Sequence, residues 1–228
     1  MKISVIIPVF NEEKTILKIV EKILNQDEPI HEIIIIDDGS SDGTKTKVEE
    51  ISLKHKIVKY HFKDQNEGKG SAIKKGIELI TGDIVIFQDA DLEYNPKDYK
   101  KLILPFKETD AQVVYGSRFL GGKYSRLHFF WHYVANKILT TFCNILTNLN
   151  MTDMETGYKL FKSDTLKSIY LKENSFGIEP EITIKLSKLN SIFYEVPISY
   201  RGRSYEEGKK IKLKDAFVAI YCLIKYSI

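Results

Sequence analysis

Two aspartates separated by a single residue, Asp89 and Asp91, are the side chains of this sequence best suited to bind a metal ion. They directly follow the apolar segment 83–88, and Glu93 adds a further carboxylate two residues later. Mg²⁺ and Mn²⁺ prefer oxygen ligands and usually share them with the phosphates of a substrate. An Asp-x-Asp pair alone is a weak motif, but the three carboxylates together predict a divalent-cation site that binds a phosphorylated ligand.

Three further polar clusters follow apolar segments that are typical of strands, at residues 8–12, 37–44 and 116–118. Any one of them could simply cap the helix that follows, because Asp, Asn and Ser are preferred N-cap residues. In an open parallel sheet, however, the carboxyl ends of the strands meet at one edge, and ligands bind there. Four clusters that end four strands therefore predict one shared binding site.

Hydrophobic periodicity in the first half of the chain predicts the elements that bring these clusters together. Apolar runs predict strands at 3–10, 31–37, 56–62, 83–88 and 111–115. Helical spacing predicts helices at 12–24, 41–53 and 69–80 and from Pro96 onward, with Asn11 and either Ser41 or Asp42 as N-caps. Strands that alternate with helices are typical of βαβ units, so we expect an α/β fold with a mostly parallel, Rossmann-like sheet flanked by helices.

The second half of the chain predicts further helices and two more strands. The expected elements are helices at 127–149, 163–171, 180–189 and 213–226 and strands at 156–161 and 192–200. Pro197 indicates that the last strand lies at an edge or contains a bulge. We expect one compact domain over residues 1–211, followed by a basic and apolar C-terminal helix at 212–228.

The composition is that of a globular chain. Of the 228 residues, 43% are hydrophobic and 29% are charged, which argues against disorder and against a polytopic membrane protein. Cys143 and Cys222 cannot form a disulfide framework, and we expect two buried thiols in a reducing compartment. No signal peptide is expected, and the apolar run 216–224 is shorter than the roughly 20 residues of a bilayer span.

The sequence lacks several common site motifs. It contains no glycine-rich dinucleotide fingerprint, no Walker loop, no zinc-ligand spacing and no nucleophile elbow. It also offers no aromatic stacking platform or basic recognition helix for nucleic acid. Positive charge is instead local, because residues 201–214 contain six Lys or Arg and only two Glu, whereas the whole chain carries +3.

Four segments together resemble family 2 glycosyltransferases of the GT-A fold: 4–12, 37–44, 66–70 and 89–91. Three later segments are similar to the polyprenyl-phosphate glycosyltransferases of that family, such as dolichyl-phosphate mannose synthase. They are 116–118, 153–161, and 195–198 followed by Arg203, Lys209 and Lys210. The resemblance covers nearly the whole chain, and its N-terminal motifs are the more specific ones.

This resemblance implies an inverting, metal-dependent enzyme that takes a sugar from a nucleoside diphosphate (GDP or UDP). The implied nucleotide-sugar-binding residues are Pro8, Phe10, Asn11, Glu12, Asp37, Asp38, Lys69, Asp89 and Ala90. Asp89, Asp91 and Glu93 would hold Mg²⁺ or Mn²⁺ on the diphosphate. The family usually has Gln where Glu93 stands, so this carboxylate either tightens metal binding or binds another partner.

The implied acceptor is a polyprenyl (dolichyl or undecaprenyl) phosphate. A lipid phosphate is already anionic at pH 7, so it requires cations rather than a general base. The candidate cations are Arg118, Arg126, Arg203, Lys209 and Lys210, and the expected catalytic residues are Asp91, Arg118 and Arg203.

Two alternatives to a transferase with a lipid-phosphate acceptor remain open. A sugar hydroxyl in a polysaccharide or glycolipid would require a base, for which Asp153, Glu155, Glu179 and Glu181 are candidates. A second alternative is a non-catalytic module that only binds a nucleotide sugar.

A membrane contact is the last expectation. The basic stretch 209–214 precedes the apolar segment 216–228, and such a helix can lie in the bilayer interface. Phe129, Phe130 and Trp131 could add aromatic contacts. We expect peripheral association at the cytoplasmic face of the membrane, although both helices could instead pack on the sheet, and the oligomeric state stays open.

Overall fold

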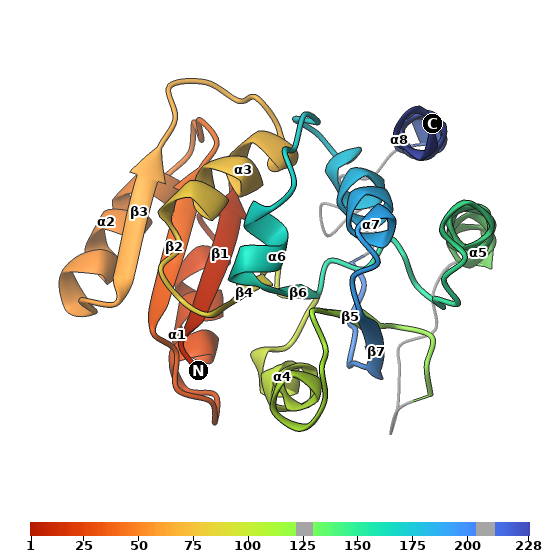
Figure 1. Cartoon of the computed structure of the whole chain (residues 1–228). Helices are drawn as coiled ribbons and strands as arrows, with labels where there is room; N and C mark the ends of the chain where they lie inside the picture. Colours follow the sequence, from red (N-terminus) through yellow and green to blue (C-terminus); the bar gives the residue numbers. More distant parts are fainter. Residues whose placement is uncertain (122–129, 204–212) are drawn as a thin grey trace.

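The computed structural model describes residues 1–121, 130–203 and 213–228. Its centre is a seven-stranded sheet (Figure 1). The strands are β1 (Ile3–Val9), β2 (Glu32–Asp37), β3 (Val58–Phe62), β4 (Ile84–Phe87), β5 (Val113–Ser117), β6 (Lys159–Lys162) and β7 (Phe193–Pro197). They lie in the order β3-β2-β1-β4-β6-β5-β7.

The sheet is mostly parallel, as the strand and helix alternation predicts. The strand β6 is antiparallel to both of its neighbours, β4 and β5, and every other pairing is parallel. The strands β1, β2, β4 and β5 therefore all point the same way, and their carboxyl ends meet at one edge. Pro197 ends the outermost strand β7, which confirms the expected edge position.

Helices cover both faces of the sheet (Figure 1). On one face lie α1 (Ile16–Leu24), α2 (Thr44–Lys54) and α4 (Tyr99–Glu108), the last preceded by the 3₁₀ turn η1 (Pro96–Asp98). On the other lie α3 (Lys69–Leu79), α5 (Phe130–Thr147), α6 (Ser163–Lys167), α7 (Ile178–Lys188) and α8 (Leu213–Ser227). Along β1, Val5 and Ile7 enter the first core and Ile6 enters the second, because side chains alternate along a strand.

Two predicted helix starts are wrong. The helix α1 begins at Ile16 rather than at residue 12, and Asn11 does not cap it. Asn11 has a left-handed backbone (φ 53°), and its side chain accepts a hydrogen bond from the Ser41 amide instead. The helix α2 begins at Thr44, although the predicted Asp42 does accept a hydrogen bond from the Thr44 amide (3.0 Å). Both loops are thus tied to each other at the sheet edge.

The C-terminal helix α8 packs against α7 and α5 (Figure 1). One of its faces buries Ala219, Cys222 and Leu223 in the second core, while Phe217 and Tyr221 stay exposed. Cys143 and Cys222 are both buried free thiols, as expected. Within the described ranges, no helix combines the length and apolar character that a membrane crossing needs.

Candidate active site

A pocket of about 720 Å³ opens at the carboxyl edge of the sheet. All four polar clusters that were singled out in the sequence contribute to its wall. The predicted residues that line it are Pro8, Phe10, Glu12, Asp38, Lys69, Asp89, Ala90, Asp91, Glu93, Arg118 and Arg203. The expected convergence of four strand ends on one site is therefore confirmed.

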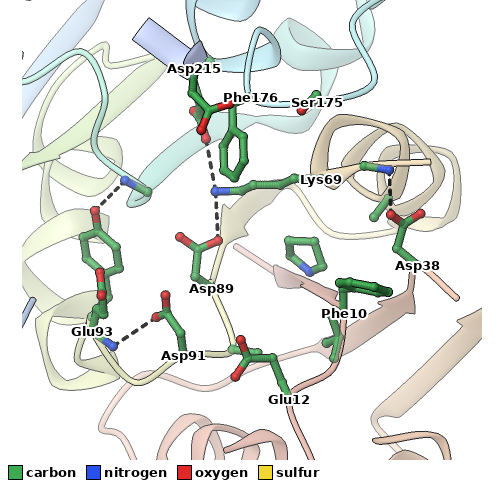
Figure 2. A pocket seen from close by; sticks show the side chains of 18 of the residues that line it. Phe10, Glu12, Asp38, Lys69, Asp89, Asp91, Glu93, Ser175, Phe176 and Asp215 are labelled. Atoms are coloured by element: carbon green, nitrogen blue, oxygen red, sulfur yellow. Dashed lines mark hydrogen bonds and ion pairs between the residues drawn. The ribbon is translucent and has the colours of Figure 1, made fainter. Parts of the chain in front are cut away.

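The order of the strands gives the pocket a direction. Pro8, Phe10 and Asp38 follow β1 and β2, whereas Asp89 and Asp91 follow the central strand β4. Figure 2 shows Phe10 and Asp38 on one side of Asp89 and Glu93 on the other. The segment that leads into β6, and the residues after β5, close the far end.

Two predicted nucleotide-binding residues are not part of the pocket lining. Asp37 is buried and accepts a hydrogen bond from the Ser40 amide (2.8 Å), and Asn11 binds Ser41. Their neighbour Asp38 does line the pocket, where it accepts the Gly68 amide (2.6 Å) and pairs with Lys63 (2.8 Å). Asp38 thereby holds the loop before α3 against the end of β2.

Lys69 occupies the centre of the pocket and points at Asp89 (Figure 2). Its Nζ lies 2.8 Å from Asp89 Oδ1 and 3.2 Å from Glu179 Oε1. The other oxygen of Glu179 lies 2.5 Å from the Nζ of the fully buried Lys159. Although burial alone lowers the pKa of Lys69, Asp89 and Glu179 raise it well above its usual range. Lys69 is therefore a permanent cation in an alternating chain of charges.

Gly68 allows this placement of Lys69. It has φ 105°, a conformation that residues with a Cβ rarely adopt, and an added Cβ would lie 2.4 Å from the Asn174 carbonyl oxygen. The close approach of the two backbones sets α3, and with it Lys69, against the loop that precedes α7.

Asp91 lies in an excess of negative charge. Burial, together with Asp89 and Glu93, raises the pKa of Asp91 to about 7 against the opposing effect of Arg203. Arg203 Nη2 lies 2.8 Å from Asp91 Oδ2, and its Nη1 lies 3.8 Å from Glu12 Oε1. One guanidinium thus pairs with several carboxylates, so net negative charge remains in this part of the pocket. A further cation could bind there.

Glu93 binds protein groups with both of its oxygens. Its Oε1 accepts the Arg203 amide (2.9 Å) and faces Arg203 Nε (3.2 Å), and its Oε2 accepts the Tyr200 hydroxyl (2.5 Å). The sequence left open whether Glu93 tightens metal binding or binds another partner, and in the structure it binds Arg203 and Tyr200. Glu93 anchors Arg203 at the pocket rather than presenting a free oxygen.

The remaining carboxylates fit a divalent cation that a ligand would complete. Asp89 and Asp91 supply hard oxygen donors at the end of β4, as Mg²⁺ and Mn²⁺ require. Among the described residues, no group of three His, Cys, Asp or Glu side chains forms a complete metal site. Two carboxylates would leave the other coordination positions of such a metal to water or substrate phosphates.

Arg118 forms a two-pronged ion pair with Asp153. Its Nε lies 2.7 Å from Oδ2 and its Nη2 lies 2.7 Å from Oδ1. The ring of Tyr200 lies 5.1 Å from the guanidinium carbon. Burial raises the pKa of Asp153, but Arg118 lowers it below its usual value. Asp153 is thus held as the anionic partner of Arg118, which fixes this arginine at the pocket wall.

Two other base candidates are also committed to partners. Glu179 is bound by Lys69 and Lys159, as described above, and these lysines hold its pKa below the usual value although burial raises it. Glu181 lies away from the pocket, where it accepts the Lys172 and Glu173 amides (both 2.8 Å) and pairs with Lys185. Glu155 and Glu179 both line the pocket with a buried oxygen that has no hydrogen-bond partner in the described part of the chain, but the Glu179 oxygen lies 2.5 Å from Lys159 Nζ, whereas no ion pair of Glu155 is seen there.

Sequence reasoning missed several pocket residues. Tyr94, Tyr200, Phe176 and Asp215 line the pocket, and none of them belongs to a motif that marked it. Asp215 lies in the first turn of α8, so the C-terminal helix contributes to the site (Figure 2). Three predicted acceptor residues, Arg126, Lys209 and Lys210, lie outside the described residues, as does Phe129.

The sequence matches the model of the family described as glycosyl transferase family 2 over residues 4–170. An uncharacterised protein of Methanocaldococcus jannaschii is 32% identical, with 90% of this chain and 93% of that protein covered. A dolichol-phosphate mannosyltransferase of Pyrococcus furiosus is 30% identical over 92% of this chain, which spans 61% of that relative's length. A dolichyl-phosphate beta-glucosyltransferase of Trichomonas vaginalis is 28% identical, with 99% of this chain and 73% of that protein covered.

Solved structures confirm the predicted GT-A fold. Glucosyl-3-phosphoglycerate synthase of Mycobacterium tuberculosis, in complex with Mn²⁺, UDP and glucosyl-3-phosphoglycerate, superposes with a TM-score of 0.74. The match covers 99% of this chain and 80% of that one at 21% identity. The same synthase has been solved with Mg²⁺ and UDP and matches with a TM-score of 0.75.

Proposed function

Because the chain belongs to glycosyl transferase family 2, we propose that it transfers a sugar from a nucleoside diphosphate sugar to a polyprenyl phosphate. The transfer would proceed with inversion and with Mg²⁺ or Mn²⁺. The observation that carries this proposal is the meeting, in one pocket, of the Asp89 and Asp91 pair with two arginines, Arg118 and Arg203.

The donor would lie along the pocket in the order of the strands. Phe10 and Pro8 provide apolar contacts for the base of GDP or UDP at the β1 end, and the diphosphate reaches Asp89 and Asp91. A divalent cation held there would neutralise the charge on the departing nucleoside diphosphate. Lys69, already positioned by Asp89 and Glu179, supplies a fixed positive charge on the same side. The M. tuberculosis synthase, solved in complex with UDP and Mn²⁺ or Mg²⁺, supports a nucleoside diphosphate donor and a divalent cation.

The acceptor phosphate would be met by Arg118 and Arg203 at the far end of the pocket. Both guanidiniums are oriented by carboxylates, Arg118 by Asp153 and Arg203 by Glu93. A guanidinium can bind phosphate with two parallel hydrogen bonds, and a phosphate anion needs no base to attack. The names of the P. furiosus and T. vaginalis relatives, both dolichyl-phosphate transferases, support this acceptor class.

A hydroxyl acceptor is the second candidate, and Glu155 is the observation that favours it. Burial, with the charges of Glu179 and Asp153, raises the pKa of Glu155 to about 7 although Lys159 and Arg118 oppose this rise. A carboxyl group with such a pKa is suited to general-base catalysis near neutral pH. The M. tuberculosis synthase, whose structure also holds phosphoglyceric acid, supports an acceptor of this kind.

We also propose peripheral association with the cytoplasmic face of a membrane through α5 and α8, with residues 212–228 acting as the attachment segment. The two helices contact each other and expose large apolar side chains. The most exposed are Phe130, Trp131, Ile138, Ile145, Phe217 and Tyr221. The basic sequence 209–214 would add attraction to anionic lipids.

The test is a transfer assay with UDP- and GDP-sugars, Mn²⁺ and a short-chain polyprenyl phosphate. We expect transfer by the wild type and a fall of at least about a hundredfold in Asp91→Asn, with normal activity in the exposed control Asp64→Asn. Glu155→Gln should keep transfer to the lipid phosphate, because no base is needed. If the wild type transfers the sugar only to a hydroxyl acceptor, and Glu155→Gln loses that transfer, the second candidate is favoured. No transfer from any donor would indicate a non-catalytic binding module.

A further inference from the structure

Glu155 lies on the side of Asp89 that is opposite to the nucleoside end of the pocket. It precedes β6, which runs antiparallel between β4 and β5, so its segment enters the sheet at the edge where β4 ends. The segment passes directly against Asp89, since a Cβ on Gly157 would lie 2.5 Å from Asp89 Oδ2. A group attached to the far phosphate of a bound nucleoside diphosphate would therefore meet residues 155–157.

The Glu155 side chain has an unused hydrogen-bonding atom at this place. Its Oε1 is fully buried and has no hydrogen-bond partner among the described residues. Buried polar atoms in folded proteins are nearly always paired, and an unpaired one is costly. A bound ligand that supplies the missing partner would remove this cost.

The cations near Glu155 are already committed elsewhere. Lys159 binds Glu179 (2.5 Å) and the Thr156 carbonyl oxygen (2.5 Å), and Arg118 binds Asp153. Glu179 and Asp153, Tyr115 of β5 and Cys143 of α5 also interact with Glu155. With a pKa of about 7, the Glu155 carboxyl group is protonated in about half of the molecules near pH 7. A neutral carboxyl can both donate and accept a hydrogen bond.

The chemistry of the three possible ligand groups selects one of them. A phosphate accepts charge-assisted hydrogen bonds, so the cations Lys69, Arg118 and Arg203 are better partners for it than a carboxyl group. A nucleobase would lie at the opposite end, beside Phe10. A sugar hydroxyl, in contrast, is itself both donor and acceptor and matches a neutral carboxyl group.

We infer that Glu155 is a specificity-determining residue that hydrogen-bonds a hydroxyl group of the donor sugar. This inference rests on the proposed function, because it takes a nucleoside diphosphate sugar as the donor. It assigns Glu155 to the donor and not to the acceptor. The contact discriminates between sugars that differ in the position of a hydroxyl group, since a misplaced hydroxyl would leave the buried oxygen unpaired.

The experiment compares the binding of a nucleotide with that of its sugar conjugate. Calorimetric titrations with Mn²⁺ would use UDP, UDP-glucose and UDP-galactose, and likewise GDP and GDP-mannose, with the wild type and with Glu155→Gln and Glu155→Leu. We expect Glu155→Leu to weaken binding of the preferred nucleotide sugar about tenfold while the Kd of the nucleotide alone is unchanged. Glu155→Gln, which keeps a donor and an acceptor, should retain most of this affinity.

The epimer comparison separates recognition from a structural role. The wild type should prefer one epimer, and Glu155→Leu should bring the two affinities close together, which a general loosening of the pocket would not do. Equal losses for nucleotide and nucleotide sugar, or no loss at all, would overturn the inference and leave the proposed function intact. Normal donor binding by Glu155→Gln with abolished transfer would make Glu155 the base and also overturn it. Wild-type protein that binds neither UDP nor GDP would overturn the proposed function itself.

Discussion

Replacement of Arg203 by Ala should strengthen metal binding while it weakens transfer. The guanidinium of Arg203 lies 2.8 Å from Asp91 and 3.2 Å from Glu93, so it neutralises carboxylate charge that a divalent cation would otherwise use. Without it, Asp91 and Glu93 lose the positive charge beside them, while Lys69 stays paired with Asp89. The same residue is the proposed partner of the acceptor phosphate, so its loss should impair the reaction.

The size of the effect follows from charge and exposure. Charges of +2 and +1 placed about 5 Å apart repel each other by about 2 kcal/mol in water and about 7 kcal/mol at an effective dielectric constant of about 20. The Arg203 side chain retains 19% of its surface in contact with solvent and can move aside, so the lower figure is the appropriate one. We therefore expect Mn²⁺ to bind at least about tenfold more tightly to Arg203→Ala.

The assay is a Mn²⁺ titration of the nucleotide-free protein, followed by calorimetry, with the transfer rate measured separately. Arg201→Ala is the matched control, because it removes the same charge from an exposed side chain two residues away. The transfer rate of Arg203→Ala should fall about 10- to 150-fold, and Arg203→Lys should restore only part of it, since an ammonium cannot bind phosphate with two parallel bonds. Unchanged or weaker Mn²⁺ binding by Arg203→Ala, or an equal gain in Arg201→Ala, would refute the reasoning.

Two further measurements test the membrane contact and the packing of the sheet. The double replacement Phe217→Ser and Tyr221→Ser should reduce binding to anionic liposomes at least about tenfold. The control Leu53→Ser on α2 replaces an even more exposed apolar side chain and should not reduce it; equal effects would argue against a membrane contact through α8. The second measurement concerns the buried Glu32 of β2. Burial raises the pKa of Glu32, but hydrogen bonds from Lys59, Ser4 and Thr81 lower it to about 2. The stability that Glu32 confers is therefore present above pH 4.5 and is lost as the pH falls toward 2. Denaturant unfolding at pH 7 and pH 3 should show a smaller pH effect in Glu32→Gln than in the wild type or in the exposed control Glu108→Gln.

The sequence predicted most elements because their signals are local. Four consecutive isoleucines at 33–36 form a strand that is buried on both faces, and such a run is typical of parallel sheets. The placement of β6 between β4 and β5 could not be predicted, because it depends on pairing between distant segments. Local capping rules failed at Asn11 for a related reason: its side chain binds Ser41, 30 residues away, and not the helix that follows it.

The site shows the same division between local and long-range information. Asp89, Asp91, Lys69, Arg118 and Arg203 were found from short motifs, and the structure brings all five into one pocket. Their ion-pair partners were not predicted, since each pair joins residues far apart in the chain.

The Arg118–Asp153 and Arg203–Glu93 pairs change the chemical interpretation of these residues. Sequence alone left Asp153 as a candidate base and Glu93 as a candidate metal ligand. The structure shows that each of them pairs with an arginine.

The balance of charge in the pocket links the binding of metal and nucleotide. Glu12, Asp89, Asp91 and Glu93 lie together at one part of the wall, where Lys69 pairs with Asp89 and Arg203 pairs with the other three. A nucleoside diphosphate that entered this region alone would add negative charge beside an Asp91 whose pKa is already raised to about 7. A divalent cation between them would attract both the carboxylates and the diphosphate and so remove this repulsion. Nucleotide affinity should therefore depend strongly on the metal. Once Asp91 binds the metal, Arg203 would be available to a second anion, which we propose is the acceptor phosphate.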